Sequence, residues 1–217
     1  MRRVKHFGFL GACAIALMVA APAQAVMYSF FKITNNGNPD VASQLVVDVT
    51  DGGTVGLTNY VDFKFTNNVG TASSITDIYF DDGTLFGISS ITDSGAGVAF
   101  NDPATPGDLP GGNNASPPFV TTQNFSADSD SPVSDNGVNS ASEWVTIRFE
   151  LINGQDWTDT LDALGDGSLR MGLHVQAIGT PGGSDSYVSN GIVPVPGAAL
   201  LGAMGLGLVG LRRRSAA

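Results

Sequence analysis

Side chains able to act as acids, bases or nucleophiles are few in this chain. Apart from His6, His174 is the only histidine, so any Ser-His-Asp device must use it. No Gly-x-Ser-x-Gly motif accompanies it. His174 alternates with apolar residues and shares the polar side of its run with Arg170 and Gln176, which predicts a solvated surface histidine. We therefore expect that the chain is not an enzyme.

Two carboxylate patterns point to hydrolytic chemistry, and both have a simpler interpretation. Asp93-Ser94-Gly95-Ala96 matches the short aspartic-protease signature, in which two carboxylates share a proton. It occurs once, so a monomer cannot build the pair, although a homodimer could. Glu143 and Glu150 lie seven apart on one predicted strand and face opposite sides, whereas a glycosidase needs two carboxylates flanking one bond. A plain Asp-Gly turn is expected at Asp93.

Calcium is the one candidate cofactor, because clustered loop carboxylates suit a cation that takes six to eight oxygen ligands. Asp128, Asp130 and Asp135 form the candidate site. Their spacing is not that of an EF-hand, since Pro132 and Val133 stand where a ligand and the glycine belong. Solvated turn aspartates are the alternative. A lone histidine rules out a catalytic zinc site of the usual kind.

The first 25 residues predict a secretory signal peptide. Three basic residues precede an apolar run from Phe7 to Ala21. Ala23 and Ala25 then supply the small residues that signal peptidase recognises, so cleavage after Ala25 would leave Val26 first. The only cysteine, Cys13, lies in this removable segment, so the remaining chain is expected to fold without disulfides.

The last 25 residues, 193–217, contain three ordered features. Pro194 and Pro196 end the preceding fold, and an uncharged run from Gly197 to Leu211 follows. As a helix this run would span roughly 22 Å, short of the ~30 Å hydrocarbon core of a membrane, so we predict a short transmembrane helix that anchors the chain marginally. Basic residues are costly to translocate, which predicts a cytoplasmic terminus for the closing cluster Arg212, Arg213 and Arg214.

This order of proline motif, apolar run and arginine cluster resembles the PEP-CTERM sorting signal, whose bearers are exported and processed by a membrane-embedded exosortase. Val195 replaces the glutamate of the Pro-Glu-Pro motif, and Val-Pro-Val-Pro-Gly, ending at Gly197, looks like the VPxPA-type variant. The segments Asp77–Gly83 and Asp108–Gly112 also resemble a recurrent ectodomain attached to such tails. The resemblance implies transient anchoring in the inner membrane, then a cell-surface or extracellular location in an exopolysaccharide-producing bacterium.

The segment between the two ends, 26–192, is acidic. It holds four of the ten basic residues and all twenty acidic ones, which leaves a formal net charge of −16. Such a surface repels nucleic acid and anionic lipid, so neither is an expected partner. The expected partners are signal peptidase and exosortase during export, and an exopolysaccharide afterwards.

Period-two alternation predicts eight or nine short strands in this segment, separated by Gly- and Asp-rich turns. We predict an all-β fold, an antiparallel β-sandwich or jelly roll, with one short helix from Trp157 to Leu164. The Pro-, Gly- and Ser-rich stretch Asn101–Asn139 is too long for an ordinary loop and is expected to be mobile or functional.

Two functions remain open from the sequence. The first is a non-enzymatic surface or matrix protein delivered through the sorting tail. The second is a carbohydrate-binding module of the jelly-roll type, in which exposed aromatic side chains such as Trp144 or Tyr79 stack on sugar rings.

Overall fold

The structure is a computed structural model that describes residues 25–83, 86–179 and 182–192. Ala25, the predicted cleavage position, is the first described residue and begins a strand. The rest of the predicted signal peptide, including Ala23, lies outside the described residues. So do all the predicted sorting-signal residues: Pro194, Val195, Pro196, Gly197, Arg212, Arg213 and Arg214.

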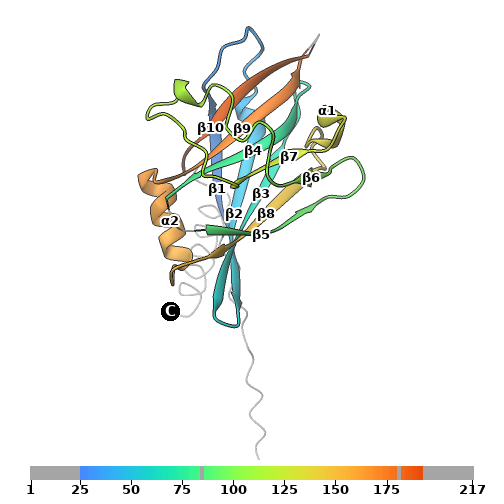
Figure 1. Cartoon of the computed structure of the whole chain (residues 1–217). Coiled ribbons are helices and arrows are strands. Elements are labelled where there is room, and N and C mark those ends of the chain that lie inside the picture. The colour runs from blue at the N-terminus through green and yellow to red at the C-terminus, as the bar shows by residue number, and fades with distance from the viewer. Residues whose placement is uncertain (1–24, 84–85, 180–181, 193–217) are drawn as a thin grey trace, which may run out of the picture.

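The described chain is mostly β-strand with two short helices (Figure 1). The helices are α1 (Val133–Asn136) and α2 (Trp157–Asp166). The strands are β1 (Ala25–Lys32), β2 (Leu45–Val55), β3 (Thr58–Asn67), β4 (Ser74–Asp82), β5 (Phe86–Asp93), β6 (Phe100–Asn101), β7 (Ser126–Ser129), β8 (Trp144–Leu151), β9 (Leu169–Ile178) and β10 (Gly183–Ile192).

All the strand pairs are antiparallel and join into one sheet in the order β5-β8-β3-β2-β1-β10-β9-β4-β7-β6. The sheet curls on itself into a nearly closed, barrel-like shape, so its two halves face each other across the interior (Figure 1). The predicted antiparallel all-β fold with a short helix is confirmed. Instead of the two separate sheets of a sandwich, the ladders are continuous.

Period-two burial explains why these segments are strands. Val61, Phe63 and Phe65 of β3 point inward and are buried, while Asp62 and Lys64 alternate with them on the outer side. The centre of the core is aromatic and joins the two halves of the sheet. Phe80 of β4 packs at 4.7 Å from Phe149, 5.1 Å from Phe63 and 6.1 Å from Phe65 between ring centroids, in edge-to-face arrangements.

The predicted helix is confirmed as α2. Asp156 caps its first turn by accepting hydrogen bonds from the N–H groups of Thr158 and Asp159, and the Asp159 side chain accepts from the Asp156 N–H. Gly167 ends the helix with a left-handed backbone (φ 81°), a conformation that glycine adopts without strain.

The long stretch after β6 is folded onto the sheet rather than extended into solvent. Leu109 and Phe119 are buried and lie over Gly172 of β9, where a Cβ would come within 2.8 Å of the Leu109 side chain. With Tyr79 and Val188 they form a second hydrophobic cluster on the outer face of β4, β9 and β10. This segment therefore covers one face of the sheet.

The two ends of the described chain lie at the same end of the sheet. Tyr28 of β1 pairs with Ile192 of β10, so the strand that follows the predicted signal peptide lies beside the strand that precedes the predicted tail. The turn between β2 and β3 projects from this end as well (Figure 1). Among the described residues no helix has the length and apolar character needed to cross a membrane.

Candidate functional site

His174 is not the solvated surface histidine that its sequence pattern predicts. Its side chain is 16% exposed, and its Nδ1 lies 3.0 Å from Oδ2 of the buried Asp77 on the neighbouring strand β4. Thr76 Oγ1 donates to the same carboxylate oxygen at 2.7 Å. Alternation places His174 on the outer face of the sheet, and the prediction assumed that this face is open to solvent. It is wrong because neighbouring side chains of the sheet enclose His174 there.

The Asp77–His174 pair orients the imidazole as in Ser-His-Asp enzymes, where the carboxylate contacts Nδ1. Ser186 is the residue paired with His174 across β9 and β10. Among the described contacts no hydrogen bond joins the two, and Ser186 is buried. Tyr79 closes the other side of Asp77, with its hydroxyl 3.4 Å from Oδ1. Burial first, and then the Asp77 charge, raise the pKa of Tyr79. The cluster is suited to holding strands together.

Tyr79 was a candidate for sugar stacking, and the structure contradicts that role. Its side chain is fully buried beneath the segment that carries Leu109 and Phe119, and its hydroxyl donates to the carbonyl of Pro106 at 3.1 Å. Tyr79 lies on the outer face of β4, away from the interior of the sheet, but a second layer buries it there. The sequence pattern gives no sign of this layer.

Asp185 on β10 anchors an extensive buried polar network. It is buried, pairs with Lys32 Nζ at 2.8 Å and accepts hydrogen bonds from Thr34 Oγ1 at 2.8 Å and Asn38 Nδ2 at 2.9 Å. The backbone N–H of Asn36 donates to it as well. Burial alone would raise the pKa of Asp185, but these four hydrogen bonds outweigh burial and hold its pKa below the usual range. The network fastens the chain after β1 to β10.

Two of the three predicted calcium ligands accept hydrogen bonds from other groups. Asp128 accepts from the N–H of Thr105 at 3.0 Å, and Asp130 accepts from Asn101 Nδ2 at 2.6 Å. Asp135 lies in the single turn of α1. The described residues contain no group of three or more His, Cys, Asp or Glu side chains placed to hold a metal ion. A calcium ion here would have to take most of its ligands from carbonyl and hydroxyl oxygens.

The Asp93-Ser94-Gly95 motif forms a turn after β5. Oδ1 of Asp93 accepts the N–H of Gly95 at 2.9 Å, and the N–H of Ser94 donates to the carbonyl of Trp144. A side chain that hydrogen-bonds the backbone two residues on is the ordinary Asp turn expected from the sequence.

The outer face of β3 and β8 carries partly exposed aromatic and charged side chains. Lys64 Nζ lies 4.9 Å from the ring centroid of Trp144, and the Arg148 guanidinium lies 5.6 Å from that of Tyr60. Arg148 also binds Asp62 through two hydrogen bonds of 2.7 and 2.6 Å. Neither ring is in the core, so this face presents two aromatic side chains beside paired charges.

Tyr60 and Trp144 lie far apart on this face. Tyr60 pairs with Glu150, six residues along β8 from Trp144, which corresponds to about 20 Å at ~3.3 Å per residue. Trp144 is among the aromatic residues predicted to be exposed, whereas Tyr60 is not. The alternation that sets Asp62 and Lys64 outward also sets Tyr60 outward and could have identified it.

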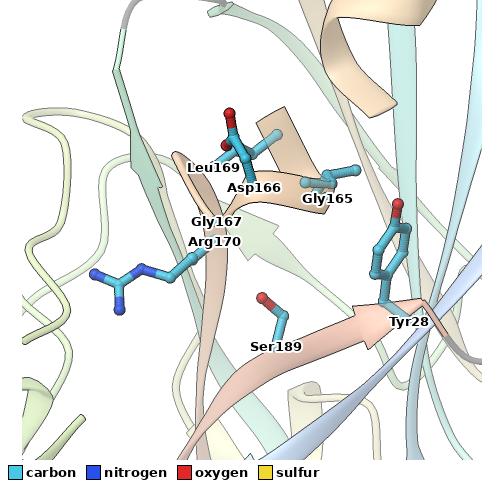
Figure 2. Close-up of a pocket in the computed structure, with 8 residues that line it drawn as sticks. Tyr28, Gly165, Asp166, Gly167, Leu169, Arg170 and Ser189 are labelled. Carbon is cyan, nitrogen blue, oxygen red and sulfur yellow. The ribbon is translucent and has the colours of Figure 1, made fainter. Parts of the chain in front are cut away.

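A recess of about 180 Å³ lies where β1, β9, β10 and α2 meet (Figure 2). The hydroxyl of Tyr28 lines it and is buried without a hydrogen-bond partner among the described residues. The Arg170 side chain points away from Tyr28 and pairs with Asp81 of β4 (Figure 2). Asp166 also lines the recess, and its Oδ1 accepts the N–H of Ser168 at 2.8 Å. The recess has room for water molecules that would satisfy Tyr28, and its two charged residues, Asp166 and Arg170, are each engaged in other contacts.

Comparison with known proteins adds no assignment to this geometry. No family model, curated protein or solved structure matches the chain.

Proposed function

We propose that the chain is an exported, non-enzymatic protein of the cell surface or extracellular matrix, linked to exopolysaccharide and processed through its C-terminal sorting signal. Signal peptidase would remove residues 1–25. The tail 193–217 would hold the chain in the inner membrane until an exosortase processes it.

The observation that carries this proposal is the position of the last described strand. β10 runs to Ile192, so the proline motif begins two residues after that strand in the sequence. A sorting enzyme that acts at the proline motif would leave all the described strands in one product. The pairing of Tyr28 with Ile192 places the attachment points of both predicted membrane-directed segments side by side.

The side-chain chemistry of residues 26–192, the body of the protein, supports a binding or structural role. His174 is held by Asp77, and Asp128 and Asp130 of the candidate calcium site accept hydrogen bonds. The two charged residues at the Tyr28 recess are paired elsewhere, Asp166 with the N–H of Ser168 and Arg170 with Asp81. A formal net charge of −16 on residues 26–192 keeps an exported domain soluble and disfavours nucleic acid. The test is the intact mass of the chain recovered from the surface and medium of its native host.

A carbohydrate-binding module, with or without calcium, is the second candidate. The facing halves of the sheet resemble the layers of a jelly-roll sandwich, and Trp144 and Tyr60 on one outer face favour this candidate. The rings could stack on sugars about 20 Å apart, a distance that suits an extended polysaccharide rather than a single sugar.

A glycan array of defined oligosaccharides, run with and without calcium, separates the two candidates. We expect no glycan signal for the wild-type chain in either condition, because Lys64 and Arg148 each lie against one of the two rings. Binding that falls roughly 30-fold in Trp144→Ala, the loss expected for a central aromatic contact, would support the module instead. Phe31→Ala is the matched control, since Phe31 is 40% exposed on β1, away from this face.

A further inference from the structure

The turn between β2 and β3 is an exposed, uncharged and apolar tip. Leu57 is fully exposed and Val55 is 65% exposed. Ile152 lies beside them at 36% exposure, because Asn59 Nδ2 donates to the carbonyl of Gln155 at 3.0 Å and ties the two loops together. From Gly52 to Val61 there is no charged residue, although the body as a whole carries a formal charge of −16.

This tip projects beyond the point where the tail begins. Tyr28 pairs with Ile192 on one side and with Val47 on the other, so Ile192 and Val47 lie at the same level of the sheet. Val55 is eight residues further along β2, or about 25 Å at ~3.3 Å per residue. The tip extends from the end of the sheet at which β1 begins and β10 ends (Figure 1).

The connection to the apolar run of the tail is shorter than that projection. Residues 193–196 separate Ile192 from Gly197, and the five residue steps between these two positions span at most about 18 Å when fully extended. If the run enters a bilayer, Ile192 is held within that distance of the membrane surface. The tip, which reaches further than the connection, then meets the lipid unless the strands lie flat on the membrane.

We propose that Val55 and Leu57 insert into the surface of the zwitterionic lipid bilayer that the tail enters, with Ile152 at the edge of the contact. The proposal rests on the proposed function, because the tail must first bring this end of the body to the membrane. Two apolar side chains bind a membrane weakly by themselves, but tethering raises their effective concentration at its surface.

The charge around the tip and the small size of the tip favour a zwitterionic lipid surface as its binding partner. Asp51 and Asp62 flank the uncharged stretch, and the acidic body repels anionic lipid, so a zwitterionic surface fits better. A second copy of the chain is a poor fit, because stable protein interfaces bury roughly 1,200–2,000 Å², far more than two side chains at a hairpin tip provide.

The test is site-specific fluorescence of the full chain reconstituted in phosphatidylcholine vesicles. In a Cys13→Ser background, Leu57→Cys carries an environment-sensitive NBD group, and Val55→Cys provides a second position in the tip. Val133→Cys is the matched control, since Val133 is an exposed valine on α1 toward the opposite end of the molecule (Figure 1). Flotation of the vesicles measures anchoring separately.

We expect the chain to float with the vesicles, with emission from both tip positions shifted to shorter wavelength and quenched by doxyl-labelled lipid. Emission at 133 should stay at its value in buffer. Flotation with unshifted emission at 55 and 57 would overturn the lipid-inserting tip and leave tail anchoring intact. A chain that fails to float would overturn tail anchoring itself, and the inserted tip with it.

Discussion

Replacing Asp185 with alanine should lower the free energy of unfolding by about 3–5 kcal/mol, the loss typical when one partner of a buried ion pair is removed. Lys32 would keep its charge in a largely buried position, with a side chain 12% exposed. Asn36 and Asn38 would each lose a hydrogen bond that holds the segment after β1 against β10. Urea denaturation followed by circular dichroism measures the change.

Asp62→Ala is the matched control for this prediction. Asp62 also pairs with a cation, Arg148, but the Arg148 side chain is 39% exposed, and pairs of this kind contribute about 0.2–1 kcal/mol. Equal losses in the two variants would show that the Asp185 network does not hold the fold as described.

We also expect the stability loss in Asp185→Ala to depend on pH. Because the pKa of Asp185 lies below that of an unfolded aspartate, its stabilisation is present above the unfolded pKa of about 3.9. It is lost as the pH falls through the lower folded pKa. The difference in stability between wild type and Asp185→Ala should therefore be constant at neutral pH and shrink below pH ~4.

Replacing Phe80 with alanine should cost about 3–5 kcal/mol, because it removes a buried ring from the centre of the core and leaves a cavity. Phe80 contacts Phe63, Phe65 and Phe149 and so joins β4 to the opposite half of the sheet. In a domain of typical stability, about 5–15 kcal/mol, this is a large share. Thermal and urea unfolding of the same samples give the measurement.

Phe31→Ala is the control for the core variant, since Phe31 is exposed on β1. Its loss should change stability by no more than about 0.5 kcal/mol. A Phe80→Ala protein that unfolds at the wild-type urea concentration would contradict the assignment of these rings to one shared core.

The strands could be predicted because their burial alternates with the sequence. Val61, Phe63 and Phe65 show this pattern plainly, and α2 carries its own cap and glycine stop. The two-residue alternation does not show which distant strands pair with each other. The joining of β1 to β10 makes the sheet continuous, and it depends on residues about 160 positions apart.

The candidate site was less predictable from the sequence. The incorrect predictions concern side chains that neighbouring segments cover, and the local sequence does not show that cover. Tyr79 was expected to be exposed, yet Leu109 and Phe119, thirty or more residues later, cover it. Asp185 lies among turn residues, Gly-Gly-Ser-Asp-Ser, where an aspartate is normally solvated, and its partners lie near the other end of the chain. The apolar tip Val55-Gly56-Leu57 is visible in the sequence, but its position at the end of the sheet where β1 begins and β10 ends is not.

The most direct test of the proposed function is the intact mass of the chain recovered from the outer surface and medium of its native host. We expect a species that starts at Val26 and ends near the proline pair at 194 and 196. A recovered species that retains the arginines at 212–214 would contradict processing through a sorting signal.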